Sequence, residues 1–465
     1  MKFIPLNNSP NISSSRFDSV SPSMQLDSRG FPHIVWLEKK LGHNEVHYAF
    51  WDGLQWTSKS SVIVDWAKGS ISLSRSGIIL EDDKSVLVYV KRDTDSTSLN
   101  VAFSNGMSWD INKMVLPYDC LWAGIAKSSK ESIYYRSSSS SSTDNESSIS
   151  SSYKDSDVII FTYDGSKIRV YSVGNGIFRL LSENNFAIVN HFNIKLVGCG
   201  SSIGLVCQED SGLIYNFFRV ENEVWEFSSF GSVGSVNDSI LDFDITGGGY
   251  GFDEDGVMQI AWLRDTYSDF YVMKTEVDTD GVIDSNIIYQ KTKNVQSLGF
   301  ISGGFSKIAI GITDSFKNMI LCLGAKSSLY DQISEHEWGI YDIDIDSMGN
   351  RFNPSTLSLK IYHEDGIDYP KLSFCNDNSD VYYLEYNGED GFEESYPEMV
   401  VLNSERVFIS EWECGLLKGD DIDNTFYTVA GDILKESIDK TFVVFSQGED
   451  PDYNTSSSSS SSSSG

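Results

Sequence analysis

A two-part repeat of strand-like segments constrains the fold of this chain more than any other feature. Its first part is a turn followed by an apolar strand, MQLDSRGFPHIVWLE at Met24–Glu38, which returns as YGFDEDGVMQIAWLR at Tyr250–Arg264 and partly as IDIDSMGN at Ile343–Asn350. Aspartate caps such a turn with its side chain and glycine tolerates positive φ, so both are needed there. The turn residues are Asp27, Asp253 and Asp346, each followed three positions later by Gly30, Gly256 and Gly349.

The second part of the repeat is a hairpin. Its clearest copy is VHYAFWDGLQWT at Val46–Thr57, where Asp52-Gly53 between apolar runs is a strong hairpin signal. Six similar segments follow, and successive copies begin 49 to 62 residues apart. They begin at Leu99, Val158, Leu213, Phe270, Met319 and Val381. A fainter eighth hairpin is TFYTVAGDIL at Thr425–Leu434.

An all-β repeat with a period near 50 residues predicts a β-propeller. Each blade is expected to be a four-stranded antiparallel sheet, which buries its faces only by packing against neighbouring blades. We predict seven blades, with eight or six as alternatives. Trp36 and Trp262, at matched positions, are expected to fill the space between blades. The run KTFVVFSQ at Lys440–Gln447 is expected to pair with an N-terminal strand and close the ring.

Two serine tracts delimit the expected domain. Residues 1–452 are assigned to the propeller, and 453–465 to a serine-rich linker or tail that suggests a longer parent protein. Residues 137–157 are expected to form a disordered serine-rich loop inside one repeat, because they cannot bury enough apolar surface to offset the entropy cost of ordering. DILKESI, near Ile433, is the single stretch with a brief helical pattern.

Charge and cysteine usage limit the possible partners. The formal net charge is −32, from 67 acidic and 35 basic residues, so we expect no nucleic acid partner. No apolar run approaches the about 18 residues of a membrane span, so membrane insertion is not expected. The six cysteines form no CxxC pair, and neither a thiolate zinc site nor a disulfide framework is predicted.

The strings LDSRGFPHIVW and VHYAFWDGLQW resemble the repeats of sialidase-like propellers, the bacterial neuraminidase repeat type. The resemblance is good in the first repeat, fair at Tyr250–Arg264, and elsewhere one of rhythm across Pro22–Gln447. Such repeats occur in bacterial surface proteins and in phage tail or virion proteins. The resemblance therefore implies a propeller on a virion or cell-surface appendage, but a fold does not specify an activity.

The catalytic features of the resembling family are not met. Sialidases carry a Phe/Tyr-Arg-Ile-Pro motif, an arginine triad, a Tyr–Glu pair and an acid/base aspartate. The nearest string here, Lys2-Phe3-Ile4-Pro5, lacks the arginine, and Ser104–Trp109 approaches an Asp-box without its aspartate. The chain resembles a non-catalytic variant, and we lean towards no enzyme activity. A sialidase-like glycoside hydrolase or lyase is one alternative, and an intracellular protein-interaction propeller is another.

The sequence singles out no catalytic, cofactor-binding or metal-ligating residue, and the ligand is unknown at this stage. His43 and His47 have a metal spacing for a helix, but on a hairpin strand they need not share a site, so no zinc is expected. Asp342–Asp346 departs from a calcium loop, because glycine is not at the sixth position and no glutamate is at the twelfth. Of two further acidic stretches, Phe252–Gly256 coincides with a repeat turn, and Gly419–Asn424 is an expected loop for which calcium binding stays open.

The expected function is therefore non-enzymatic recognition or a structural role in a virion, tail or cell-surface appendage. The expected partners are a glycan or cell-surface receptor and other virion or appendage proteins, without a cofactor. No secretory signal is visible at the N-terminus. A phage particle assembles in the cytoplasm, so an adhesin synthesised there and displayed on the virion or extracellular surface needs none.

Overall fold

The computed structural model describes fifteen stretches with most of their side chains and, beyond residue 292, the strands alone. The first group is 18–27, 31–51, 62–74, 77–81, 84–104, 108–126, 158–174, 176–186, 194–209, 212–221, 224–228, 231–234, 239–247, 256–266 and 268–292. The second group is 300–305, 309–314, 319–323, 339–342, 354–364, 367–376, 381–385, 398–399, 415–418, 426–427, 433–434 and 441–444.

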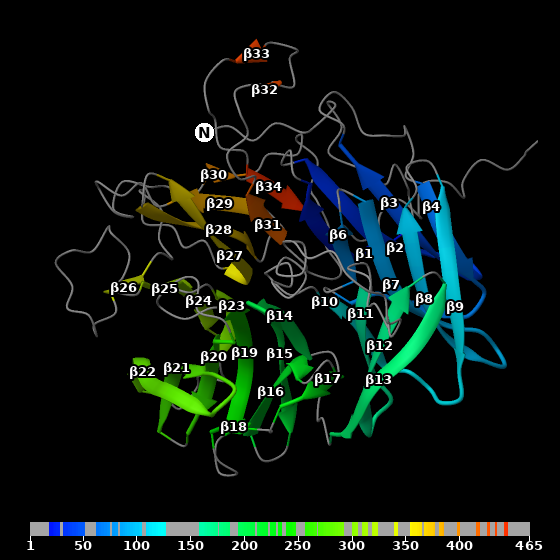
Figure 1. Ribbon diagram of the computed structural model, residues 1–465. Helices are drawn as coiled ribbons and strands as arrows, with labels where there is room; N and C mark the ends of the chain where they lie inside the picture. Colours follow the sequence, from blue (N-terminus) through cyan, green and yellow to red (C-terminus); the bar gives the residue numbers. More distant parts are fainter. Residues whose placement is uncertain are drawn as a thin grey trace, which may run out of the picture.

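The first three sheets are built from consecutive antiparallel strands (Figure 1). The first contains β1 (Asp18–Leu26), β2 (Pro32–Lys40), β3 (His43–Phe50) and β4 (Val62–Ala67). The second contains β5 (Ser70–Ser72), β6 (Ile78–Glu81), β7 (Lys84–Arg92), β8 (Thr97–Ser104) and β9 (Trp109–Leu116), with β5 and β6 both paired to β7. The third contains β10 (Trp122–Ala126), β11 (Val158–Tyr163), β12 (Lys167–Gly174) and β13 (Ile177–Asn185).

The fourth and fifth sheets continue the pattern. The fourth contains β14 (Lys195–Cys199), β15 (Ser202–Glu209), β16 (Gly212–Glu221), β17 (Val224–Phe227) and β18 (Gly231–Val233), which also pairs with β16. The fifth contains β19 (Ser239–Gly247), β20 (Met258–Asp265), β21 (Asp269–Val277) and β22 (Val282–Thr292).

Two further four-stranded sheets and two strand pairs complete the described chain. The sixth sheet contains β23 (Phe300–Phe305), β24 (Ala309–Asp314), β25 (Met319–Leu323) and β26 (Gly339–Asp342). The seventh contains β27 (Pro354–Glu364), β28 (Ile367–Asn376), β29 (Val381–Glu385) and β30 (Glu398–Met399). The pairs are β31 (Gly415–Lys418) with β34 (Thr441–Val444), and β32 (Phe426–Tyr427) with β33 (Ile433–Leu434).

The sheets are arranged as a closed ring, which makes the fold a β-propeller. The innermost strands contact one another in the order β1, β6, β10, β14, β19, β23, β27 and β31, and β31 returns to β1. Figure 1 shows the sheets following one another around a common centre. The all-β fold with four-stranded antiparallel blades is confirmed, whereas the count of seven blades stays a prediction.

Ring closure differs from the sequence expectation. Strand β34 pairs with β31 rather than with an N-terminal strand, and it is β31 that lies against both β1 and β27. Ile433–Leu434 is a strand paired with Phe426–Tyr427, so the helical expectation there was wrong, whereas the faint eighth hairpin does pair. The described residues contain no helix long and apolar enough to cross a membrane.

Hairpin positions agree with the repeat except in the third sheet. The segment beginning at Val158 is the β11–β12 hairpin, one strand earlier in its sheet than the β3–β4 copy at Val46. Asp164-Gly165 does form the turn of this hairpin. Gly165 has a φ of 99°, and Asp164 Oδ1 accepts the amide hydrogens of Ser166 and Lys167. An Asp-Gly pair therefore marks a hairpin without marking which hairpin of a blade it is.

The hydrophobic core lies between sheets, as the repeat predicts. Val35, Leu37 and Tyr48 of the first sheet pack with Leu87 and Tyr89 of the second. Between the fourth and fifth sheets the packing includes Phe217, Phe243 and Trp262. Central strands are therefore buried on both faces, whereas the outer strands β9 and β13 alternate with exposed positions. Trp262 fills the space between blades, as predicted.

The serine-rich insertion and the cysteines also bear on the fold. Residues 127–157 connect β10 to β11, so the expected loop at 137–157 is inside one repeat, although it lies outside the described residues.

Cys120, Cys199 and Cys207 are buried free thiols, so these three form no disulfide, as expected. Burial raises the pKa of Cys120 to about 12, so this thiol is chemically inert at neutral pH.

Candidate functional site

One face of the first sheet carries an unusual set of aromatic and charged side chains. Successive side chains of a strand point to opposite faces. Val35 and Leu37 pack against the second sheet, so Trp36 and Glu38 of β2 lie on the face directed away from it. We call this set the His–Glu face. Its members are Trp36, Glu38, Lys40, His43, Glu45, His47 and Trp66.

Glu45 of β3 is the centre of the His–Glu face. Its Oε1 lies 2.8 Å from Nε2 of His43, and its Oε2 lies 2.7 Å from Nε2 of His47. Nζ of Lys40 lies 2.5 Å from the same Oε2. Burial acts to raise the pKa of Glu45, but the hydrogen bonds from Lys40, His47 and His43 outweigh it and hold the pKa at about 2. Glu45 is therefore ionised throughout the neutral range.

A second carboxylate, that of Glu38, lies beside this centre. Glu38 and Glu45 are direct cross-strand partners, and the Glu38 side chain is only 1% exposed. Its Oε2 lies 3.5 Å from Nζ of Lys40 and 3.6 Å from Nε2 of His47. Its Oε1 is buried without a hydrogen-bond partner. A buried carboxylate oxygen in this state costs free energy, so the cluster is incomplete among the described residues.

The His–Glu face runs from this buried centre to an exposed rim. Trp66 lies opposite Glu45 on the outermost strand β4 and is 52% exposed. Its ring meets that of His43 edge-to-face, with centroids 6.1 Å apart. Outer strands β9, β13 and β22 also expose large apolar side chains, but these are aliphatic. Trp66 is the single aromatic ring among the exposed large hydrophobic side chains of the described stretches.

Trp36 is the cross-strand partner of His47, and its indole lacks a hydrogen-bond acceptor. Its ring stacks on His47, with centroids 5.6 Å apart, and its Nε1 is buried without a hydrogen-bond partner. At the matched position of the fifth sheet, Nε1 of Trp262 donates to Oγ1 of Thr275 at 3.1 Å. The first sheet has Ala49 where the fifth has Thr275, since Ala49 lies opposite Ile34 as Thr275 lies opposite Ile260.

Sequence reasoning missed the convergence of His43 and His47. The expectation was that on a hairpin strand the two histidines need not share a site, whereas residues i, i+2 and i+4 of a strand lie on one face. Here His43, Glu45 and His47 alternate along β3, and both imidazoles contact the carboxylate between them. The pattern HxExH within a predicted strand was the signal that could have found the site. Glu38, Glu45 and His47 are the described residues placed to hold a metal ion.

A second polar group combines Ser85, His33 and Asp27 across the first and second sheets. Nδ1 of His33 lies 3.0 Å from Oγ of Ser85 and 2.5 Å from Oη of Tyr48. Nε2 of His33 lies 3.8 Å from Oδ2 of Asp27. The residue types are those of a hydrolase triad, but the Asp–His distance exceeds a hydrogen bond and Ser85 is 1% exposed. With the serine sealed from substrate, this group is structural.

Asp27 also confirms its predicted role in the repeat turn. Its Oδ1 accepts the amide hydrogen of Phe31 at 2.7 Å, and the Asp27 amide donates to the Phe31 carbonyl. Gly256 has a φ of 75°, the conformation for which the repeat glycine was assigned. Gly30, Asp253 and the stretch Ile343–Asn350 lie outside the described residues.

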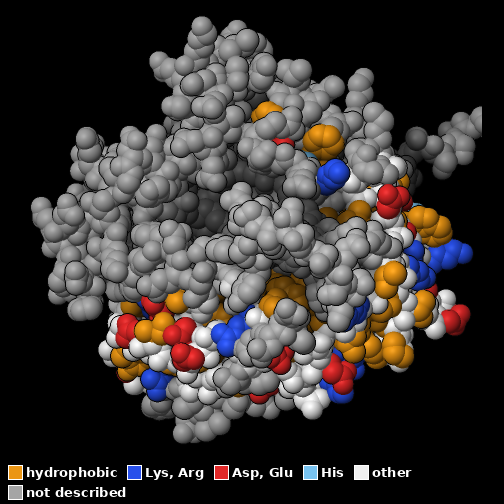
Figure 2. Space-filling view, in the orientation of Figure 1, with side chains coloured by type: hydrophobic (Ala, Val, Ile, Leu, Met, Phe, Trp, Pro, Cys, Tyr) orange, Lys and Arg blue, Asp and Glu red, His pale blue; other side chains and the backbone are white. Residues whose placement is uncertain are grey.

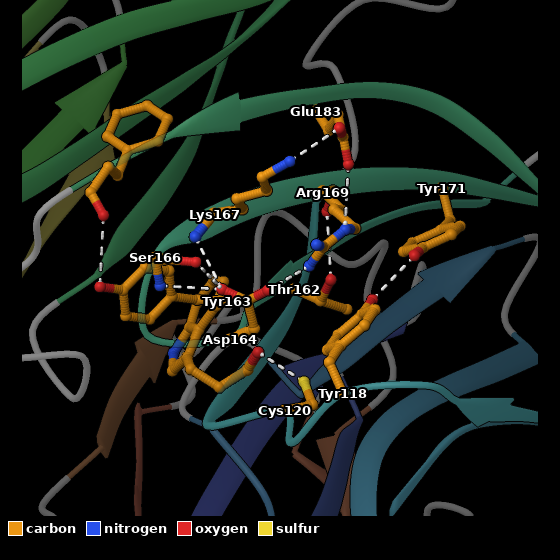
Figure 3. Close-up of polar contacts among 12 residues, drawn as sticks. Tyr118, Cys120, Thr162, Tyr163, Asp164, Ser166, Lys167, Arg169, Tyr171 and Glu183 are labelled. Atoms are coloured by element: carbon orange, nitrogen blue, oxygen red, sulfur yellow. Dashed lines mark hydrogen bonds and ion pairs between the residues drawn. The ribbon is translucent and has the colours of Figure 1, made fainter.

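A third polar cluster, in the third sheet, is electrostatically complete (Figure 3). Arg169 donates to Asp164 at 2.6 Å and to Glu183 at 3.2 Å, and Lys167 donates to Glu183 at 3.0 Å. The Arg169 guanidinium also lies 4.0 Å from the ring centroid of Tyr118. Two cations thus match two carboxylates. We read this cluster as a structural ion network rather than as a ligand site.

Other residues considered from the sequence do not form a site. Ser104 and Trp109 are register partners flanking the β8–β9 turn, the place of an Asp-box, but the turn itself lies outside the described residues. Lys2–Pro5 and Gly419–Asn424 lie outside them too. In the other two acidic stretches, Asp342 is the last residue of β26 and Gly256 lies in a turn; their remaining residues are not described.

The surface of the described sheets carries both signs of charge. Figure 2 shows Lys and Arg side chains interspersed with Asp and Glu on the visible face, without a continuous basic patch.

Comparison with known proteins adds fold-level similarity. No protein-family model matches the chain, and no curated protein matches it. Among solved structures, it is similar to Sqt1 of Saccharomyces cerevisiae, with 11% identity, 93% of this chain and 95% of that chain covered, and a TM-score of 0.49. The WD40 domain of Toxoplasma gondii coronin is 10% identical, with 82% of each chain covered and a TM-score of 0.39.

A lectin is also among the similar structures. The Aleuria aurantia lectin is 12% identical, with 84% of this chain and 99% of that chain covered and a TM-score of 0.34. Because these scores are below 0.5, the propeller assignment rests on strand pairing and on the ring of innermost strands. The sialidase-like repeat type stays a prediction.

Proposed function

We propose that this protein is a non-enzymatic recognition propeller that binds a glycan at the rim of its His–Glu face. The observation that carries the proposal is the exposed ring of Trp66 beside His43, Lys40 and Glu45. A sugar presents an apolar C–H face and a ring of hydroxyls. An exposed indole offers stacking area for the first, and fixed charged groups offer hydrogen bonds to the second.

The described arginines do not form the cluster that a sialidase-type site requires. A sialidase-type site gathers three arginines around one carboxylate. Here the five described arginines lie on second, third and fourth strands of four different sheets, and none is on an innermost strand. These residues are Arg92, Arg169, Arg179, Arg219 and Arg264. Arg169 is already held by Asp164, Glu183 and Tyr118.

The proposed location follows from the sequence resemblance alone. Sialidase-like repeats occur in phage tail or virion proteins and in bacterial surface proteins, so we place this propeller on such an exposed particle or appendage. A glycan or receptor on a target cell is then its natural partner, and neighbouring virion or appendage proteins would hold it. Immunogold labelling of intact particles tests this location, and label confined to the cytoplasm contradicts it.

A protein-interaction role is the second candidate, favoured by the net charge of −32. An acidic surface attracts a basic partner through long-range forces that added salt weakens. A glycan stacked on Trp66 depends little on salt. Affinity measured at low and high ionic strength therefore separates the two functions once any ligand is in hand.

The direct test is a glycan array probed with the full chain, followed by titration of each hit against variants. Trp66→Ala is expected to weaken binding by about tenfold or more, since stacked aromatic groups dominate such contacts. Gln290→Ala is the matched control, because Gln290 lies opposite Tyr271 in the fifth sheet as Trp66 lies opposite Glu45 in the first.

The control defines what would contradict the proposal. Gln290→Ala should bind every array hit as the unchanged chain does. If Trp66→Ala also binds with unchanged affinity, the glycan site lies elsewhere on the molecule. If the folded chain binds nothing on an array that covers sialylated, fucosylated and bacterial surface glycans, the glycan proposal is wrong.

A further inference from the structure

We infer that Glu38, Glu45 and His47 form a binding site for a divalent cation of the zinc class. This inference goes beyond glycan recognition and does not depend on it, because it concerns the group Glu38, Glu45 and His47, of which only Glu45 also belongs to the proposed glycan site. Metal binding can be measured with no glycan present, so the two proposals fail separately.

The first support is geometric. One ligand atom from each of Glu38, Glu45 and His47 lies within 4.8 Å of the others. Glu45 and His47 are two residues apart on β3, and Glu38 is the cross-strand partner of Glu45 on β2. Ligands held about 2.1 Å from a zinc ion are roughly 3.4 Å apart in tetrahedral geometry. Small side-chain rotations therefore suffice to bring three donors to one ion.

The second support is a buried carboxyl oxygen that lacks a partner. The carboxyl groups of Glu38 and Glu45 lie together, and the Lys40 ammonium contacts both. Oε2 of Glu38 contacts Lys40, whereas Oε1 of Glu38 is buried without a hydrogen-bond partner. The third-sheet cluster, by contrast, has two cations for two carboxylates. A dication at the centre of the His–Glu face gives this oxygen of Glu38 a partner.

The donor set selects the class of ion. Calcium prefers six to eight oxygen ligands, whereas zinc accepts a neutral imidazole together with carboxylates at low coordination number. His47 offers the lone pair of Nε2 when its proton is on Nδ1. Three protein ligands leave a fourth position, and His43, whose side chain is 34% exposed, lies on the solvent side of Glu45. Water or His43 can complete the coordination shell.

Lys40 is the resident cation that a metal ion must displace. Its ammonium contacts both carboxylates, yet its side chain is 22% exposed and flexible enough to turn into solvent. Lys40 and zinc therefore compete for the same oxygens. Removing the ammonium should strengthen zinc binding, whereas removing a ligand should weaken it, and this opposition of sign distinguishes a metal site from a purely structural ion cluster.

The experiment is isothermal titration of the chelator-treated full chain with zinc chloride, and with calcium chloride in parallel. Zinc is expected to bind at one site, and calcium is expected not to bind there. Loss of groups that merely orient a ligand weakens a metal site by about 10–100-fold, so Glu38→Gln and His47→Gln should each weaken zinc binding at least that much. Lys40→Met should bind zinc several-fold more tightly.

Glu276→Gln is the matched control, because Glu276 is a buried carboxylate beside Lys274 in the fifth sheet and has no histidine among its described partners. Its zinc affinity should equal that of the unchanged chain. Cobalt(II) titration of the unchanged chain adds a readout that needs no variant: a tetrahedral site gives intense visible absorption that zinc abolishes. No zinc binding, or zinc binding unaffected by both ligand variants together with no such cobalt spectrum, overturns the inference.

Discussion

The first and fifth sheets are copies of one repeat that differ in what surrounds a shared tryptophan. FPHIVWLE of β2 matches VMQIAWLR of β20, so that Trp36 corresponds to Trp262. Where the first sheet has Glu38, Glu45 and His47, the fifth has Arg264, Tyr271 and Met273. In the fifth sheet the Arg264 guanidinium lies 5.7 Å from the Tyr271 ring centroid, and Met273 belongs to the hydrophobic core.

This difference separates what the fold requires from what it tolerates. Both copies keep the tryptophan, the antiparallel register and the β2–β3 or β20–β21 connection of the same length. The fifth sheet builds its blade with an apolar core around Trp262, so a carboxylate pair and a histidine are not needed to form the blade. The charged residues of the first sheet are thus an addition to the repeat, which is why we assign function to them.

The largest expected effect is the loss of the shared tryptophan in its apolar setting. Trp262→Ala should lower the free energy of unfolding by about 3–5 kcal/mol, because it leaves a cavity between the fourth and fifth sheets. Chemical denaturation measures this. Trp66→Ala, at an exposed edge position, should change it by less than about 0.5 kcal/mol. Equal losses for both variants would contradict the division into core and rim.

The next effect concerns pH and the first sheet alone. The pKa of Glu45 is lowered from 4.5 to about 2, so its contribution is complete above pH 4.5 and is lost as the pH falls towards 2. At about 1.4 kcal/mol per pKa unit, it amounts to at most about 3 kcal/mol. Glu45→Gln should remove that part of the acid destabilisation, measured by denaturation between pH 6 and 2.

Asp164 of the third sheet provides the control for this pH dependence. Its pKa is also lowered to about 2, where hydrogen bonds from Arg169 and from the turn amides outweigh burial. Asp164 is unchanged in Glu45→Gln, so its acid transition should persist in that variant. A variant curve that parallels the unchanged chain down to pH 2 would show that Glu45 is not held by its three donors.

A smaller effect tests the hydrogen bond that only the fifth sheet makes. Thr275→Ala leaves Nε1 of Trp262 without its acceptor, and a buried unsatisfied donor costs about 1–3 kcal/mol. Thr275→Val keeps the volume and removes only the hydroxyl, so it should cost nearly as much. If Thr275→Val unfolds at the same denaturant concentration as the unchanged chain, the indole hydrogen bond is not a source of stability.

The smallest effect is the reverse change in the first sheet. Ala49→Ser places a hydroxyl on the strand position that corresponds to Thr275, near the unpartnered Nε1 of Trp36. A new hydrogen bond there should raise the free energy of unfolding by at most about 1 kcal/mol. Ala49→Gly is the comparison without a hydroxyl. Destabilisation by the serine as large as by the glycine would mean that the two sheets are not matched at this position.

Local physical chemistry accounts for how much of the fold was predictable. The turn at Asp27 is set by a side chain bonding four residues along the chain, and the strands by apolar runs, so both are readable from adjacent residues. The misplaced hairpin at Val158 and the pairing of β34 with β31 depend on contacts between distant segments. Short hairpins look alike in sequence wherever they stand in a blade.

The candidate site was less predictable because it is a cross-strand assembly. His43, Glu45 and His47 are close in sequence, but their convergence depends on alternate residues of the strand lying on one face with Glu45 between the two histidines. Glu38 joins them only through the register that sets it opposite Glu45. Trp66 lies on β4, and the connection between β3 and β4 is too long for the sequence to fix the register of the two strands. Residue types alone therefore suggested no ligand, metal or catalytic assignment.

The central claim is that the His–Glu face serves function and is not needed for folding. Its most direct test is the free energy of unfolding of one variant that carries the fifth-sheet residue at each matched position. The substitutions are Glu38→Arg, Lys40→Thr, His43→Asp, Glu45→Tyr, His47→Met and Trp66→Gln, since Trp36 already matches Trp262. Packed side chains commonly replace buried ion clusters without loss of stability. We predict a folded variant at least as stable as the unchanged chain; a loss of several kcal/mol would contradict the claim.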